Sequence, residues 1–139
     1  MRIMAIDYGD AHTGIAISDQ TGLLAGYTTT IHSRKQEVVT EEIGKLVEAY
    51  GVTELVLGYP KNMDGTLGPR AEKAAAFAQV LEAAFHLPVT LWDERRTTID
   101  AHNILASAGK NAKKRKQTVD AVAAALILEG YLTFKRSRG

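Results

Sequence analysis

The sequence contains no cysteine and no long hydrophobic run. Without cysteine the chain forms no disulfide and no thiolate metal site, so any bound metal must be held by oxygen or imidazole ligands. No apolar run approaches the ~20 residues of a membrane-spanning helix, and the apolar run within residues 1–7 is too short for the core of a signal peptide. We therefore expect a cytosolic protein.

Several familiar catalytic motifs are absent as well. The four histidines do not have the spacing of a zinc-peptidase motif, and no serine stands in a nucleophile-elbow motif. The loop at residues 58–70 lacks the Gly-Lys-Ser/Thr ending of a nucleotide-binding P-loop. Zinc hydrolysis, serine-triad chemistry and P-loop nucleotide binding therefore have little support in the sequence.

Positive charge is concentrated near the C-terminus, although the net charge is only +1. Residues 1–108 contain 9 Lys or Arg against 14 Asp or Glu, whereas residues 109–139 contain 8 against 2. Such a segment favours a polyanionic partner such as nucleic acid, and the alternative is ordinary solvated surface charge. The residues of this segment that we predict to bind nucleic acid are Lys110, Lys113, Lys114, Arg115 and Lys116.

The length of 139 residues, with 45% hydrophobic and 24% charged residues, is typical of one globular domain. Hydrophobic periodicity predicts five strands, at residues 2–7, 14–19, 26–32, 54–58 and 88–92. It predicts four helices, at residues 36–50, 69–85, 98–108 and 119–132. Three strands joined by short links precede two strands joined through helices, which predicts an α/β fold with a mixed five-stranded sheet flanked by helices.

Four acidic residues stand at the ends of these elements. Asp7 closes the first strand, Asp93 and Glu94 follow the fifth, and Asp120 opens the last helix. Carboxylates brought together repel one another, and in a chain without cysteine a hard cation such as Mg²⁺ or Mn²⁺ relieves that repulsion. Such a site suits phosphodiester hydrolysis, because two bound ions can activate a water and stabilise the leaving oxygen. These four acids are the candidate catalytic residues.

Each acid also has a purely structural explanation. A carboxylate at Asp120, in a first helical turn, interacts favourably with the helix dipole whatever the function. Asp93 and Glu94 have Arg95 and Arg96 beside them in the sequence as partners for surface ion pairs. Turn capping is the weaker explanation for Asp7, because this residue ends an apolar strand in which an unpartnered carboxylate is costly.

The loop at residues 58–70 offers groups for phosphate contact. Gly68 before Pro69 leaves a helix N-terminus open to an anion, and Lys61 and Arg70 stand close by in the sequence. The alternative is that the polar and glycine residues of this loop serve only to form turns. We predict that Lys61 and Arg70 bind nucleic acid.

Four stretches of the sequence together resemble the YqgF (RuvX) family: AIDYGDAHTGIAISD, LVLGYPKNMDGTLGPRAE, LWDERRTT and RKQTVDAVAAALILEGYL. The resemblance covers nearly the whole chain. Members of this family are described as similar to Holliday junction resolvases and as nucleases that process the 5′ end of the small-subunit (16S) rRNA precursor. The resemblance implies one ribonuclease H-like domain over residues 1–139, with a basic C-terminal tail at about 133–139.

The resemblance also implies roles for individual residues. Asp7 and Asp120 would be metal ligands, and the Asp93-Glu94 pair would supply another, with Glu94 preferred. The loop at residues 62–70, beginning with Asn62, would lie beside the active site, and Arg95 would either lie near the scissile phosphate or hold one of the acids. Family members commonly have arginine where this chain has His12, so a phosphate contact by His12 would depend on pH.

The leading hypothesis is a metal-dependent endonuclease that uses Mg²⁺ or Mn²⁺ on structured nucleic acid, most strongly expected to process the 5′ end of pre-16S rRNA. Alternatives are a Holliday junction resolvase acting on branched DNA and a non-catalytic, transcription-associated module that binds nucleic acid. An ATPase related to actin, Hsp70 and sugar kinases is a further alternative, but the chain has length for only one of the two domains that clasp ATP. The sequence leaves open whether the protein is a monomer or a homodimer.

Overall fold

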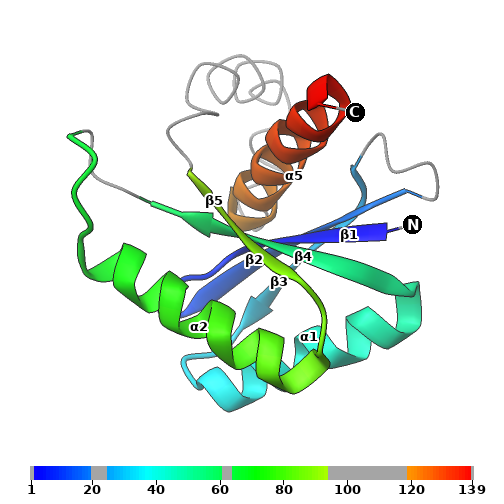
Figure 1. Ribbon diagram of the computed structural model, residues 1–139. Coiled ribbons are helices and arrows are strands. Elements are labelled where there is room, and N and C mark those ends of the chain that lie inside the picture. Colours follow the sequence, from blue (N-terminus) through cyan, green and yellow to red (C-terminus); the bar gives the residue numbers. More distant parts are fainter. Residues whose placement is uncertain (1, 20–24, 61–63, 94–118, 139) are drawn as a thin grey trace.

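The computed structural model describes residues 2–19, 25–60, 64–93 and 119–138, and for residues 119, 120 and 138 it describes the backbone alone (Figure 1). This part of the chain forms five strands and three helices. The strands are β1 (Arg2–Asp7), β2 (His12–Ser18), β3 (Ala25–His32), β4 (Val52–Tyr59) and β5 (Val89–Asp93). The helices are α1 (Gln36–Tyr50), α2 (Pro69–Phe85) and α5 (Val119–Arg138).

The strands form one mixed sheet in the order β3-β2-β1-β4-β5. The first three strands pair in antiparallel fashion, whereas β4 pairs in parallel with both β1 and β5. Because β1, β4 and β5 run in the same direction, they all end at one edge of the sheet, which we call the carboxyl edge. Asp7, Tyr59 and Asp93 are the last residues of these three strands.

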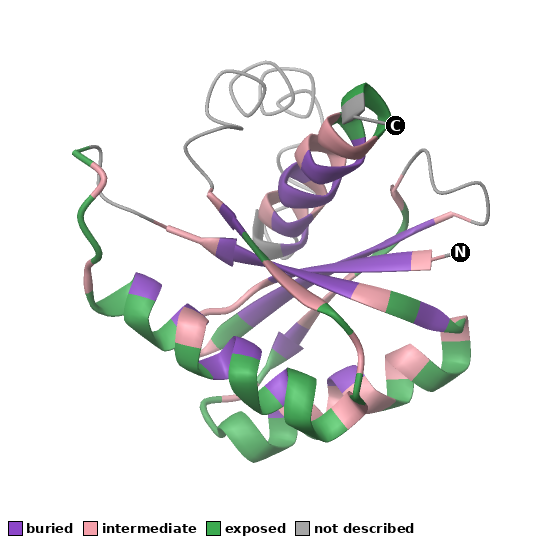
Figure 2. Ribbon diagram, viewed as in Figure 1, coloured by how far each residue is buried: buried purple, intermediate pink, exposed green. Residues whose placement is uncertain are grey.

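Alternate residues of each strand face opposite sides of the sheet, and each side carries its own hydrophobic layer. Met4 and Ile6 of β1 pack with Phe77 and Leu81 of α2 and with residues of α1, so we call this side the α1/α2 face. Ile3 and Ala5 pack with residues of α5 on the other side, the α5 face. Figure 2 shows buried residues along the central strands and exposed residues on the outer sides of α1 and α2.

The predicted end of the first helix at residue 50 and the predicted start of the second at residue 69 are both confirmed. Gly51 ends α1 in the left-handed conformation, with φ of 64°, and donates its N–H to the carbonyl of Val47. Pro69 is the first residue of α2, where its fixed φ suits the helix and its missing N–H costs nothing. These are local signals, so they can be read from the sequence.

Helix α5 extends beyond its predicted end at Leu132 and includes residues 133–138 of the predicted tail. The ring of Phe134 packs against Trp92, with the ring centroids 5.5 Å apart. Lys135 Nζ donates to Glu54 Oε1 at 2.8 Å, and the Tyr131 hydroxyl donates to the same carboxylate. Burial of the Tyr131 hydroxyl and its hydrogen bond to Glu54 raise the pKa of Tyr131. The tertiary contacts therefore stabilise the last turns of the helix.

Pairing with neighbouring strands also makes β2 and β4 begin earlier than predicted. His12 pairs with His32, so β2 begins two residues before the predicted start, and Val52 pairs with Arg2 in the same way at the start of β4. The predicted helix at residues 98–108 and the basic segment at residues 109–117 lie outside the described residues.

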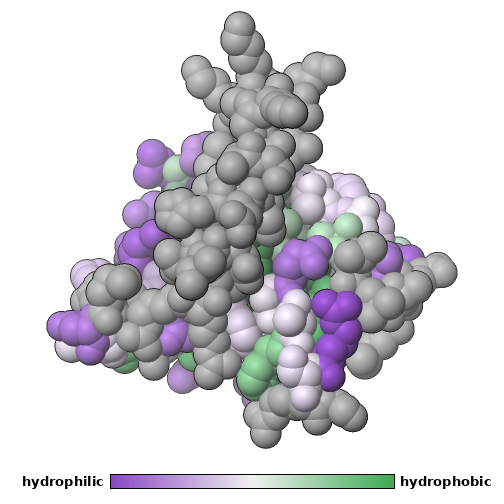
Figure 3. Space-filling view, turned by 90° about the horizontal axis from the view of Figure 1, so that it is seen from above, coloured by the Kyte–Doolittle hydropathy of each residue, from purple (hydrophilic) through white to green (hydrophobic). Residues whose placement is uncertain are grey.

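Among the described helices, none is both long and apolar enough to cross a membrane. Seen from above, the coloured surface is largely hydrophilic or neutral, and hydrophobic residues appear only in small areas (Figure 3).

Candidate functional site

Asp7 ends β1 at the carboxyl edge, in the centre of the sheet. By strand alternation it shares the α5 face with Ile3 and Ala5, and its side chain is partly exposed. Its cross-strand partner on β2 is Gly14. On the other side, Ile6 pairs with Leu57, so the position next to Asp7 on β4 is Gly58. Because neither neighbour has a side chain, the space beside Asp7 on the α5 face is not filled from the adjacent strands.

The residue after Asp7 is anchored on the opposite face. Tyr8 stacks on Phe77 of α2, with ring centroids 4.0 Å apart and an interplanar angle of 18°. Gln36 Nε2 donates to the Tyr8 hydroxyl at 3.4 Å. These contacts fix the backbone that follows Asp7 and thereby orient Asp7 toward the α5 face.

Asp93 ends β5 at the same edge but on the other face of the sheet. Trp92 packs in the α5 layer, so the next residue, Asp93, faces the α1/α2 side. The pairing of Asp93 with Tyr59 agrees, since Tyr59 packs against the α1/α2 layer. The structure therefore brings Asp7 and Asp93 to one edge without placing them on one face.

Asp120 is the second residue of α5, and its side chain lies outside the description. The later part of α5 is fixed at the edge where β1 and β3 begin, because Glu129 accepts a hydrogen bond from the N–H of Ala25. Counting back from Glu129 to Asp120, α5 extends about 13 Å along its axis. This is close to the length of β1, about 17 Å, so the helix is long enough to reach from one end of the strand nearly to the other. The first turn of α5 thus lies toward the carboxyl edge, over the face that Asp7 shares.

His12 has an unexpected partner. It lies at the start of β2 and pairs across strands with His32, the last residue of β3. Their Nδ1 atoms are 2.8 Å apart, and the rings meet edge to face with centroids 4.9 Å apart. One Nδ1 donates and the other accepts, so this hydrogen bond requires at least one ring to be uncharged. Both side chains are exposed at the end of the sheet where β1 terminates.

Three basic residues act on Asp10, in the turn between β1 and β2. Lys73 Nζ of α2 lies 3.0 Å from Asp10 Oδ1 in this turn. The hydrogen bond and charge of Lys73 lower the pKa of Asp10, with smaller contributions from Arg70 and Arg34. Sequence reasoning identified Arg70 but missed His32, Arg34 and Lys73, since no local motif marks them and only the fold brings their elements together.

Several predicted site residues lie outside the described residues: Lys61, Asn62, Glu94, Arg95, Lys110, Lys113, Lys114, Arg115 and Lys116. Within the described part of the chain, no three His, Asp or Glu side chains are grouped closely enough to hold a metal ion. The described predicted residues are Asp7, His12, Arg70 and Asp93, together with the backbone of Asp120.

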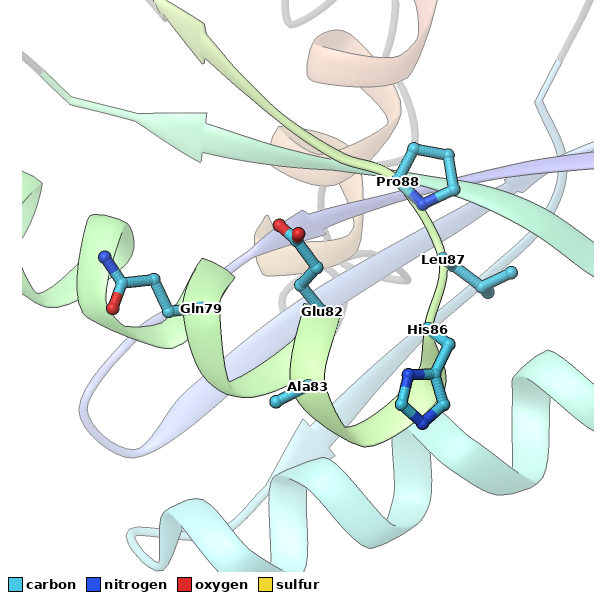
Figure 4. Close-up of a pocket in the computed structure, with 6 residues that line it drawn as sticks. All are labelled: Gln79, Glu82, Ala83, His86, Leu87 and Pro88. Carbon is cyan, nitrogen blue, oxygen red and sulfur yellow. The ribbon is translucent and has the colours of Figure 1, made fainter.

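A cavity of about 530 Å³ lies at the far end of α2 from Arg70. Figure 4 shows Gln79 and Glu82 projecting from α2, with Leu87 and Pro88 on the segment that leads to β5. Since Val89 begins β5 at the edge opposite Asp93, this cavity is separate from the carboxyl edge.

Gly9, in the turn after Asp7, has no room for a side chain. A Cβ atom at this position would lie 2.4 Å from the backbone oxygen of His12. We expect Gly9→Ala to lower the free energy of unfolding by about 1–3 kcal/mol, as overpacking does elsewhere, and to displace the turn. Urea denaturation measures the effect. Gly44→Ala is the control, because the nearest atoms to its Cβ belong to the Phe85 side chain, at 3.0 Å, and not to the backbone. A Gly9→Ala variant as stable as the wild type would contradict the expectation.

The chain is similar to known proteins over nearly its whole length. The family model described as "RuvX: Holliday junction resolvase" matches residues 1–134. A protein named "Putative pre-16S rRNA nuclease" from Halothermothrix orenii is 46% identical over 135 residues, covering 97% of this chain and 96% of the relative. One of the same name from Desulfitobacterium hafniense is 47% identical over 138 residues, covering 99% and 96%.

The fold is also found among solved structures. RuvC of T. thermophilus, in complex with a Holliday junction substrate, superposes with a TM-score of 0.63 at 14% identity, covering 97% of this chain and 96% of that one. This likeness confirms the predicted ribonuclease H-like fold, and the prediction of a nuclease agrees with the names of the relatives. With a family model that spans nearly the whole sequence, the chain belongs to the RuvX family.

Proposed function

We propose that this chain is a metal-dependent endonuclease that hydrolyses phosphodiester bonds in structured RNA and processes the 5′ end of pre-16S rRNA. The observation that carries the proposal is the position of Asp7 at the carboxyl edge, between two glycine positions and on the face that the first turn of α5 approaches. The names of the curated relatives support the choice of substrate. A cytosolic location, where such a precursor would be available, belongs to the same proposal.

The proposed metal ligands are Asp7, Glu94 and Asp120. Asp93 faces away from Asp7, which favours the neighbouring acid Glu94 as the second ligand. Carboxylate oxygens are the donors that Mg²⁺ and Mn²⁺ prefer, and the neighbouring strand positions Gly14 and Gly58 add no side chain beside Asp7, so the residues fit this cofactor. When bound, Mg²⁺ or Mn²⁺ would lower the pKa of a water nucleophile and stabilise the leaving oxygen.

The chain itself would hold and orient the substrate. Tyr8, stacked on Phe77, keeps the end of β1 rigid, so that Asp7 has a fixed position relative to the scissile phosphate. The phosphate backbone around the cut would be contacted by Lys61, Asn62, Arg70, Arg95 and His12. The basic residues from Lys110 to Lys116 would add affinity for the nucleic acid. Binding of this kind falls steeply with rising salt concentration.

A pair of neighbouring substitutions tests the ligand set. We expect Glu94→Gln to slow cleavage at least ~100-fold, about 2.7 kcal/mol in the activation barrier, because a ligand is lost. Asp93→Asn should retain the wild-type rate within about threefold, since Asp93 faces the other side of the sheet. Single-turnover cleavage of a pre-16S RNA fragment with Mg²⁺ measures both rates. The reverse pattern, with Asp93 essential and Glu94 dispensable, would refute the ligand assignment.

Branched DNA is the second candidate substrate, favoured by the description of the family model and by the fold shared with RuvC. Symmetric cleavage of a four-way junction calls for two active sites related by a two-fold axis. A homodimer that cuts junction DNA faster than precursor RNA would therefore replace the first candidate.

A further inference from the structure

The turn between β1 and β2 carries one acid among three basic side chains. Asp10 lies in this turn, and its carboxylate contacts Lys73 Nζ at 3.0 Å. The two side chains are highly exposed, 76% for Asp10 and 61% for Lys73. An exposed pair of this kind contributes little to folding stability, and both groups remain accessible to a ligand.

Two further cations lie near the same carboxylate. Arg70 is the second residue of α2, one turn before Lys73, and Arg34 lies between the end of β3 and the start of α1. Each helps to lower the pKa of Asp10, which places both within electrostatic reach of it. Three positive charges therefore act on the Asp10 carboxylate, although residues 1–108 as a whole have more acidic than basic residues.

The position of this group relates it to the candidate site. Asp10 follows Asp7 by three residues, and β3 ends beside the start of β2, so Arg34 and Asp10 lie at the end of the sheet where β1 terminates. The N–H of Ser33 donates to the carbonyl of Ala11 at 3.0 Å, which holds the two turns together. The basic group thus lies at the same end of the sheet as Asp7, on the α1/α2 side of it.

We propose that Arg34, Arg70 and Lys73 form a phosphate-binding surface for the RNA strand that enters the site, and that Asp10 keeps this surface partly neutralised. The inference rests on the proposed function and adds Arg34, Lys73 and the opposing role of Asp10 to it. A backbone phosphate would replace the Asp10 carboxylate as the partner of Lys73. Because Asp10 competes with phosphate for Lys73, the surface would favour ligands that present several phosphates at once.

Equilibrium binding of a fluorescein-labelled RNA hairpin, followed by fluorescence anisotropy without divalent ions and at several KCl concentrations, tests the surface. We expect Arg34→Ala and Lys73→Ala each to weaken binding roughly fivefold and to reduce the salt slope by about one. We expect Asp10→Asn to strengthen binding roughly threefold, because it removes the competing charge and keeps the side-chain shape.

Lys45→Ala is the matched control. Lys45 pairs with Glu42 at 3.1 Å in the middle of α1, with an exposure of 64%, and its loss changes the net charge as much as the loss of Lys73. Arg34→Ala and Lys73→Ala variants that bind like Lys45→Ala would overturn the proposal, as would weaker binding by Asp10→Asn. Circular dichroism melting of each variant verifies that it is folded. If Arg34→Ala or Lys73→Ala is unstable, Asp10→Asn still tests the surface, because the proposal expects this variant to bind more tightly than the wild type.

Cleavage by the wild type in Mg²⁺ is measured separately, so the two proposals can fail independently. Cleavage by the wild type combined with unchanged binding by all the variants would overturn the surface and leave the nuclease. Weakened binding by the variants combined with no cleavage by the wild type would support the surface and overturn the nuclease. A wild type that does not bind the hairpin overturns the surface outright.

Discussion

Asp7→Asn is expected to slow cleavage of precursor RNA at least ~1,000-fold, equivalent to about 4 kcal/mol in the activation barrier. Asparagine preserves the size and shape of the side chain but lacks the negative charge that a divalent cation requires. Asp7 lies between Gly14 and the position of Gly58, so no adjacent strand supplies a substitute carboxylate at that level of the sheet. Single-turnover cleavage in Mg²⁺, with RNA affinity measured in parallel, provides the comparison.

RNA affinity of the Asp7→Asn variant should stay within about threefold of the wild type, because phosphate contacts supply most of the binding. Asp19→Asn is the control, since Asp19 follows β2 at the end of the sheet where β1 begins. We expect this control to cut at the wild-type rate. An Asp7→Asn protein that cuts as fast as Asp19→Asn would remove Asp7 from the active site and favour a non-catalytic binding module.

Phe77→Ala is expected to lower the free energy of unfolding by about 3–5 kcal/mol. Phe77 is fully buried between α2 and the sheet, and its ring stacks on Tyr8 next to Asp7. Its removal leaves a cavity that the surrounding strands and helix fill only in part, and it removes the support of Tyr8. The variant should therefore lose both stability and cleavage rate, as measured by urea denaturation and by cleavage below its unfolding transition.

Val80→Ala is the matched control for Phe77→Ala, because Val80 lies on the same helix with 38% of its surface exposed. Its unfolding free energy should stay within about 1 kcal/mol of the wild type. Phe77→Leu retains part of the buried volume and should fall between wild type and Phe77→Ala, which keeps the comparison measurable where the alanine variant is unfolded. A loss below about 1 kcal/mol for Phe77→Ala would contradict the packing described for α2.

Local sequence signals predicted much of the fold. The end of α1 at Gly51 and the start of α2 at Pro69 depend on the conformational preferences of single residues, so they were predicted correctly. The end of α5 depends instead on contacts of Phe134 and Lys135 with Trp92 and Glu54, which are distant in the sequence. No local pattern carries that information, and the helix was predicted too short.

The same distinction applies to the site. Asp7 could be proposed from the sequence because an acid at the end of an apolar strand is unusual in itself. The choice between Asp93 and Glu94 stayed open, because it depends on which face of the sheet Trp92 packs against. The pairing of Lys73 with Asp10, 63 residues apart, arises only when α2 packs beside the turn after β1. The parts of Arg34 and Lys73 in the proposed phosphate-binding surface were therefore not visible in the sequence, although Arg70 was predicted to bind nucleic acid.

The most direct test of the proposed nuclease is the incubation of wild-type protein with a pre-16S rRNA fragment, in Mg²⁺ or Mn²⁺ and in excess EDTA, followed by mapping of the new 5′ ends. A four-way DNA junction is treated in parallel. We predict cleavage at a defined 5′ position of the RNA that requires the divalent ion and exceeds cleavage of the junction. Tight binding of the RNA with no cleavage in either metal would contradict the proposed activity, whereas preferential cleavage of the junction would contradict the proposed substrate.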